Sequence, residues 1–295
     1  MQRKSILKPL LYLAMPIVFG WAGNVYVNHA LTHRAPITLE QKTEETAKKD
    51  YTSAHPAQSP TVSITDKTPV DKLIRSWSAS EDPEKRIFAG RLLDQRTTLT
   101  HNLQYIADVA NIPQEMLLAL VYTESRGNIY AESAKKAKGP TQITKIALQD
   151  LEERLLPRYK WMVSYQTPSE FNSIQTYLQA DDAYFVRASN GLPIIEKLIG
   201  KRNFEHKNVT DLEYSLRMTG ALLTAFGIEV NKGLPYLIDY SDPCAAEKSL
   251  SSYNGGNFEI LKSAAGIPDS LPFEMRMYPV KVTNAFHEIN AATGS

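Results

Sequence analysis

The sequence predicts a mainly α-helical domain over residues 71–295. Apolar residues recur at helical spacing in most of this part of the chain, and no convincing alternation of apolar and polar residues indicates a strand. Hydrophobic residues make up 43% of the 295 residues and charged residues 22%, which is enough apolar material for a sizeable core. No repeat of fixed length is present, so we expect one domain in this part of the chain.

Residues 1–28 predict a signal anchor or a signal peptide. Arg3, Lys4 and Lys8 precede an uncharged, mostly apolar run over residues 9–27. We favour the uncleaved single-pass anchor, because the run approaches the roughly 20 residues that span a bilayer. A cleaved signal peptide is the alternative, and the absence of a Cys after the run excludes a lipoprotein. In both cases the rest of the chain is expected outside the cytoplasm, because the positive end stays inside.

Residues 29–70 predict a disordered linker. They are rich in Thr, Ser, Ala, Pro, Gln and Lys and contain almost no large apolar residue at regular spacing. Such a segment would let a membrane-bound domain act at some distance from the bilayer.

Helices are expected through most of the remaining sequence. Ser169 and Asp211 are expected as the N-caps of two of them, because Ser and Asp side chains can accept hydrogen bonds from the first helical turn. The expected helices span residues 83–98, 102–111, 113–125, 143–156, 169–189, 192–200, 212–227 and 243–254.

The helix over 113–125 ends on a carboxylate, Glu124. Pro113 suits a first helical position because its missing N–H has no partner there. The apolar face of this helix comprises Met116, Leu117, Leu120 and Val121. A carboxylate beside the negative end of the helix dipole, and partly buried, has a raised pKa. A general acid that works near neutral pH needs such a raised pKa, so Glu124 is the first candidate catalytic residue.

Each of four segments can be explained by itself as a helix end or a turn, but the four segments in this order form a pattern. The first is Glu124-Ser125-Arg126-Gly127-Asn128, and the second runs from Ser133 to Ile143. The third is Ser252-Tyr253-Asn254-Gly255-Gly256, and the fourth runs from Leu271 to Val280.

In this order the segments resemble the soluble-lytic-transglycosylase (SLT) catalytic domain of the lysozyme-like superfamily. That family shows Glu-Ser, then Asn and Ala in a loop, Gly-Leu-Met-Gln, Ala-Tyr-Asn-Ala/Gly-Gly, and Pro-x-Glu-Thr-x-x-Tyr-Val. The positions that match the pattern are Glu124, Ser125, Asn128, Ala131, Ser133, Gly139, Gln142, Tyr253, Asn254, Gly255, Gly256, Pro272, Glu274 and Tyr278. The resemblance implies a lysozyme-like domain on the periplasmic side of the inner membrane, or secreted into the periplasm if the signal is cleaved.

The resemblance implies a peptidoglycan lytic transglycosylase, a lyase that cleaves the β-1,4 bond between N-acetylmuramic acid and N-acetylglucosamine without water. Glu124 would protonate the glycosidic oxygen and then act as base toward the muramoyl 6-hydroxyl, which leaves a 1,6-anhydromuramoyl end. An ordinary glycosidase needs two carboxylates. Here the nucleophile belongs to the substrate, so one Glu suffices, and we interpret Glu132 as a solvated loop charge.

The resemblance also assigns the supporting roles. Ser125 and Gln142 would contact substrate amides, and Tyr253 would orient the Glu124 carboxyl. Asn254 would support the loop or contact sugar. Glu274 and Tyr278 are expected to line the cleft or to have a structural role rather than a chemical one. No metal or cofactor is implied, because the six histidines show no ligand spacing.

The chain departs from the family pattern in three places. Pro140 and Thr141 replace the usual Leu and Met, so we expect a stiffer and more polar groove there. Three lysines near the cleft, Lys135, Lys136 and Lys138, form a solvated loop or attract anionic groups of the wall. Residues 150–208 form a long insert whose aromatics either pack in its own core or stack on sugars. These aromatics are Tyr159, Trp161, Tyr165, Phe171, Tyr177, Tyr184 and Phe185.

The expected partners are peptidoglycan glycan strands and, through residues 1–28, the membrane. Enzymes of this type often serve a secretion or conjugation machine of the cell envelope, but the sequence identifies none. Nothing in a net charge of +1 implies nucleic acid. Two alternatives remain: a hydrolase of the goose-type lysozyme kind, and a non-catalytic scaffold that binds the wall.

Overall fold

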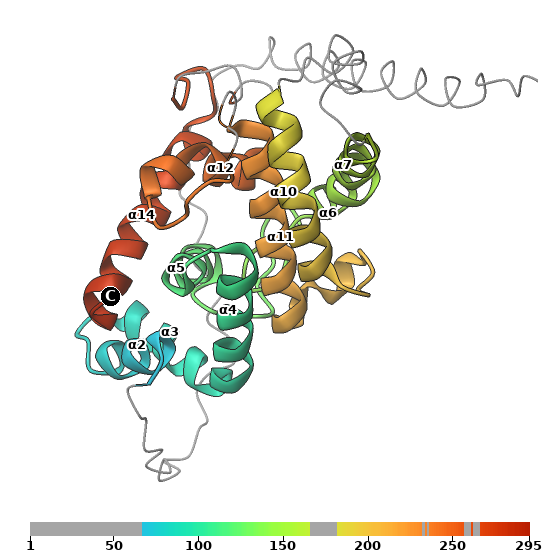
Figure 1. Ribbon diagram of the computed structural model, residues 1–295. Coiled ribbons are helices and arrows are strands. Elements are labelled where there is room, and N and C mark those ends of the chain that lie inside the picture. Colours follow the sequence, from blue (N-terminus) through green and yellow to red (C-terminus); the bar gives the residue numbers. More distant parts are fainter. Residues whose placement is uncertain (1–66, 166–181, 232–233, 235, 257–260, 262–265) are drawn as a thin grey trace, which may run out of the picture. The chain divides into compact units, whose positions relative to one another are not determined.

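The computed structural model describes residues 67–165, 182–231, 234, 236–256, 261 and 266–295 (Figure 1). All of them belong to one compact unit. The expected membrane segment and nearly all of the expected linker lie outside these residues. Within the described residues no helix is both long and apolar enough to cross a membrane.

Every named element of the described residues is a helix, which confirms the mainly α prediction. Only two isolated bridges, Glu132 with Lys138 and Lys138 with Ile143, show extended pairing in this part of the chain. The elements are α2 (Pro69–Ser78), α3 (Pro83–Asp94), α4 (Arg96–Ala110), α5 (Gln114–Ser125), α6 (Lys145–Gln149), the π-helix η1 (Asp150–Leu155), α7 (Leu156–Val163), α10 (Asp182–Ile199), the 3-10 helix η2 (His206–Thr210), α11 (Leu212–Val230), α12 (Pro243–Gly255) and α14 (Phe273–Thr293).

Helix α2 was not expected, and it begins two residues before the expected domain boundary at 71. The Thr68 side chain caps it by accepting a hydrogen bond from the Asp71 N–H at 3.1 Å. Its Trp77 joins Phe88 of α3 and Tyr122 of α5 in a buried aromatic cluster, with ring centroids 4.9–5.6 Å apart. The cluster packs α2 and α3 against the helix that ends on Glu124.

Two expected helix boundaries are wrong. The break expected between 98 and 102 lies at Gln95, whose N–H bonds back to Leu92 and Leu93 and ends α3. The helices expected over 169–189 and 192–200 are one helix, α10, from Asp182 onward, and it continues through Pro193. Gly191 permits this packing, because a Cβ there would lie 2.5 Å from Ile228 Cδ1 of α11. Close packing of α10 on α11 therefore stabilises the helix across a proline that would otherwise break it.

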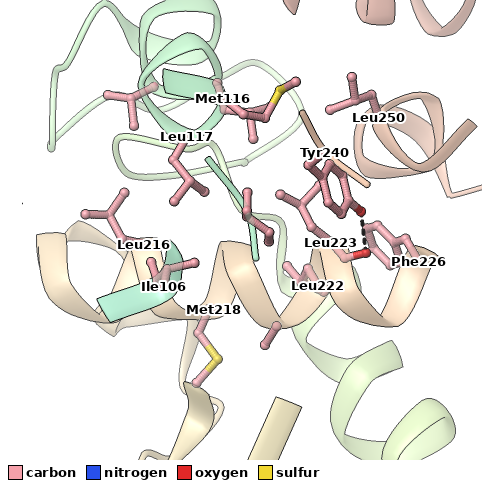
Figure 2. Packing of buried hydrophobic residues seen from close by; sticks show 14 of the residues in the cluster. Ile106, Met116, Leu117, Leu216, Met218, Leu222, Leu223, Phe226, Tyr240 and Leu250 are labelled. Atoms are coloured by element: carbon pink, nitrogen blue, oxygen red, sulfur yellow. Dashed lines mark hydrogen bonds between the residues drawn. The ribbon is translucent and has the colours of Figure 1, made fainter. Parts of the chain in front are cut away.

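Helix α11 forms the centre of the core, and almost every residue in it is buried. It contacts α4, α10 and α12, while α5 contacts α4 and α14. Figure 2 shows Leu216, Leu222 and Leu223 of α11 among Met116 and Leu117 of α5. The Asp211 N-cap is confirmed, because its carboxylate accepts from the Tyr214 N–H at 2.7 Å. Ser169, the other expected cap, lies outside the described residues.

The described part of the segment 150–208 packs on α11 through a buried polar cluster. Glu229 of α11 is 1% exposed. Its Oε1 accepts hydrogen bonds from Tyr159 of α7 at 2.9 Å and Tyr184 of α10 at 2.5 Å, and Arg158 Nη1 lies 3.7 Å from its Oε2. Tyr159 and Tyr184 are therefore core residues of this segment. Phe171 and Tyr177 lie outside the described residues.

Candidate active site

The end of α5 places Glu124 beside a tight left-handed turn. Arg126 adopts φ +52° and its N–H bonds to the Tyr122 carbonyl, as expected for a helix stop. The Arg126 guanidinium lies over the Tyr122 ring, 4.2 Å from its centroid. Arg91 of α3 donates to the carbonyls of Ser125 and Arg126 at 3.3 and 2.9 Å. The Arg126 guanidinium also donates to the Tyr122 carbonyl, so two cations contact carbonyls at the negative end of this helix.

Burial raises the pKa of Glu124 to about 7, with desolvation of the carboxyl as the largest cause. The hydrogen bond from Tyr278 and the charge of Lys281 oppose this shift. The direction expected from the sequence is therefore confirmed. A carboxyl with this pKa is partly protonated at neutral pH and can donate a proton to a leaving oxygen.

The tyrosine that orients Glu124 is Tyr278 of α14, which corrects the role expected for Tyr253. The Tyr278 hydroxyl donates to Glu124 Oε1 at 2.5 Å. Tyr278 is buried, and its ring stacks on that of Tyr253 with centroids 6.5 Å apart. Helical spacing places Glu274 and Tyr278 on one face of α14, but it does not indicate the contact of Tyr278 with Glu124.

Tyr253 of α12 instead directs its proton into a buried hydroxyl network. Its hydroxyl donates to the Thr141 carbonyl at 2.8 Å and lies 3.2 Å from Thr219 Oγ1. Thr141 Oγ1 is 2.7 Å from Ser215 Oγ and accepts from Thr219 Oγ1 at 2.8 Å. Thr141 is fully buried, so the more polar groove expected from it is wrong. Its hydroxyl is used to dock the loop on α11.

The side chains of Ser125 and Gln142 bind the protein backbone. The Ser125 hydroxyl donates to the Pro140 carbonyl at 2.7 Å. Gln142 Nε2 donates to the carbonyls of Ala131 and Gly139 at 3.0 and 2.9 Å. Both residues hold the loop after α5 in place. Gln142 lines the pocket described next, and Ser125 is not among the lining residues that the structure describes.

A pocket of about 310 Å³ opens in front of Glu124. The loop after α5, α6, α11, α12 and the start of α14 contribute its walls. Of the seven predicted site residues, five line it: Glu124, Gln142, Tyr253, Asn254 and Glu274. The other described residues that line it are Ser133, Ala134, Lys135, Ala137, Ile143, Thr144, Ala147, Leu222 and Phe226. Leu222 and Phe226 carry no polar group that could have identified them from sequence. No residue of 150–208 is among the lining residues that the structure describes.

The charged side chains near the pocket are paired with one another. Glu132 forms ion pairs with Lys136 and Lys138 at 3.3 and 3.4 Å, which lower its pKa, as fits a solvated loop charge. Glu274 Oε2 lies 3.1 Å from Lys135 Nζ. In the part of the chain that the structure describes, no group of three His, Cys, Asp or Glu residues is arranged to hold a metal ion.

Comparisons with known proteins give this chain no relative. No family profile matches it, and neither the curated proteins nor the solved structures contain a match. The function is therefore inferred from the site and from the sequence motifs.

Proposed function

We propose that this chain is a peptidoglycan lytic transglycosylase with a lysozyme-like domain, anchored on the periplasmic side of the inner membrane by residues 1–28. The observation that supports this most is Glu124 itself. Its carboxyl borders a pocket, has a pKa raised to about 7 and accepts a hydrogen bond from Tyr278. These are the properties of a single acid that later serves as a base.

In the proposed reaction Glu124 protonates the glycosidic oxygen as the C–O bond to muramic acid breaks. The resulting carboxylate then accepts the proton of the muramoyl 6-hydroxyl, whose oxygen bonds to the anomeric carbon. Glu124 is thereby reprotonated for the next cycle, and no water is consumed. Tyr278 stabilises the carboxylate between the two steps by its hydrogen bond.

A hydrolase is the second candidate, because Glu274 is another carboxylate in the wall of the pocket. An inverting hydrolase uses a second carboxylate to activate water. However, Glu274 is largely exposed and paired with Lys135. The single-carboxylate mechanism therefore remains the better interpretation.

Product analysis tests the proposal. The full-length chain is incubated with purified peptidoglycan, and the new glycan ends are identified by mass spectrometry. We expect 1,6-anhydromuramoyl ends from the wild type and at least a 10³-fold slower release from Glu124→Gln, which removes the transferable proton. Reducing ends would support the hydrolase, and a Glu124→Gln variant with full activity would contradict both enzymatic candidates.

A further inference from the structure

The rim of the pocket joins two distant segments through an ion pair. Lys135 lies in the loop after α5 and Glu274 in the first turn of α14, 139 residues apart. Both residues line the pocket. Their side chains are 79% and 74% exposed, so each keeps most of its access to solvent and to a ligand.

The backbone holds both residues in place. Lys135 lies within a tight turn in which the Ser133 N–H donates to the Ala137 carbonyl at 2.9 Å and the Ala137 N–H donates to Ser133 Oγ at 3.0 Å. Glu274 follows Pro272 at the start of a 21-residue helix, where a negative charge is favourable. The backbone positions from which one cation and one anion extend at the rim are thus held by the turn and by the start of α14.

The charges of the residues that line the pocket determine which ligand groups this rim can bind. Lys136 and Lys138 are paired with Glu132, and neither lines the pocket. Among the lining residues that the structure describes, Lys135 and Glu274 are the charged residues besides Glu124. Lys281, whose charge also acts on Glu124, is not one of these lining residues. A purely anionic ligand group would be attracted by Lys135 but repelled by Glu274. A purely cationic group would be attracted by Glu274 but repelled by Lys135.

An exposed ion pair contributes only about 0–1 kcal/mol, so a ligand can open it at little cost. A group that carries both a carboxylate and an ammonium would replace one such contact by two charge-assisted hydrogen bonds. We propose that the rim recognises a zwitterionic amino-acid branch of the glycan, with Lys135 contacting its carboxylate and Glu274 its ammonium. This inference rests on the proposed function, since the peptide branches of peptidoglycan carry both groups.

The test compares glycan strands that bear their peptide branches with strands from which the peptides have been removed. The readout is the ratio of kcat/KM for the two substrates, measured with the full-length chain. Lys135→Met and Glu274→Gln should each lower this ratio about fivefold, the effect of one exposed charge contact. Lys136→Met removes an equally exposed charge of the same loop and should leave the ratio at its wild-type value.

A charge swap separates recognition from a structural role of the pair. Lys135→Glu combined with Glu274→Lys restores an ion pair across the rim but reverses its polarity. Recognition of a branch with a fixed order of charges predicts that the ratio stays low in this double variant. A ratio restored to the wild-type value, an unchanged ratio in Lys135→Met, or an equal fall in Lys136→Met would each overturn the inference.

If the proposed function is wrong, the wild type will cut neither substrate, a result that differs from every outcome described above. Calorimetric titration of the full-length chain with the isolated peptide branch then tests the rim by itself. Binding weakened about fivefold by Lys135→Met and not by Lys136→Met supports the inference, and equal binding by all three proteins overturns it.

Discussion

At the scale of single residues, two stacked tyrosines lie near one carboxyl but only one donates to it. The Tyr278 hydroxyl stabilises the ionised form of Glu124 and so lowers its pKa, although desolvation outweighs this and leaves the value at about 7. The acid step needs the protonated form, so the rate should fall as the pH rises through about 7. In Tyr278→Phe the pKa of Glu124 rises further, and we expect the basic limb of kcat/KM to move up by about 0.5–1 pH unit.

Tyr253→Phe is the matched control for this pH profile. The Tyr253 hydroxyl donates to the Thr141 carbonyl and not to Glu124, so its removal should leave the basic limb in place. The profile is measured for the three proteins on the same glycan. A shift in Tyr253→Phe with none in Tyr278→Phe would return the orienting role to Tyr253.

At the scale of elements, the loop after α5 depends on a close approach to η2. Gly139 has φ +81°, and a Cβ there would lie 1.9 Å from the Val209 carbonyl oxygen. Gly139→Ala should therefore lower the free energy of unfolding by about 3–5 kcal/mol, from backbone strain together with overpacking. Urea unfolding measures the loss.

Gly256→Ala provides the control at a similar backbone angle. Gly256 has φ +82°, but nothing lies within 4 Å of its Cβ position. We expect a loss of about 1–2 kcal/mol from backbone strain alone. Equal losses in the two variants would show that the contact with Val209 relaxes without cost.

At the scale of the whole domain, Glu229 joins the segment 150–208 to the central helix. Glu229→Ala removes the acceptor that Tyr159 and Tyr184 share and the partner of Arg158. Because Glu229, Tyr159 and Tyr184 are buried, we expect a loss of about 3–5 kcal/mol in the free energy of unfolding. Thermal and urea unfolding, followed by circular dichroism, measure it.

Glu196→Ala is the control on the same pair of helices. Glu196 of α10 pairs with Lys160 of α7 at 3.0 Å, and both side chains are at least half exposed. Its removal should cost less than about 0.5 kcal/mol. A comparable loss in both variants would mean that the buried cluster contributes no more than a surface pair.

The sequence by itself determined the helical class, the apolar face of α5, the Asp211 cap and the position of Glu124 at a helix end. These depend on periodicity and on interactions within a few residues of one another. It also named five residues that line one pocket, although they come from segments more than 100 residues apart. Glu124 was named from its place at the end of an apolar helix, and the other four were named by the resemblance of their motifs to the SLT domain.

Only the tertiary structure decided which partners these residues meet. The continuation of α10 through Pro193, the burial of Thr141 and the choice of Tyr278 over Tyr253 each depend on contacts with a helix distant in sequence. Spacing along the chain gives the face on which a side chain lies, but not what the opposite helix offers it. For Glu124 the sequence determined that an acid stands at the end of an apolar helix. The packing of α14 and α12 around it determined its environment, because desolvation and hydrogen bonds act through space.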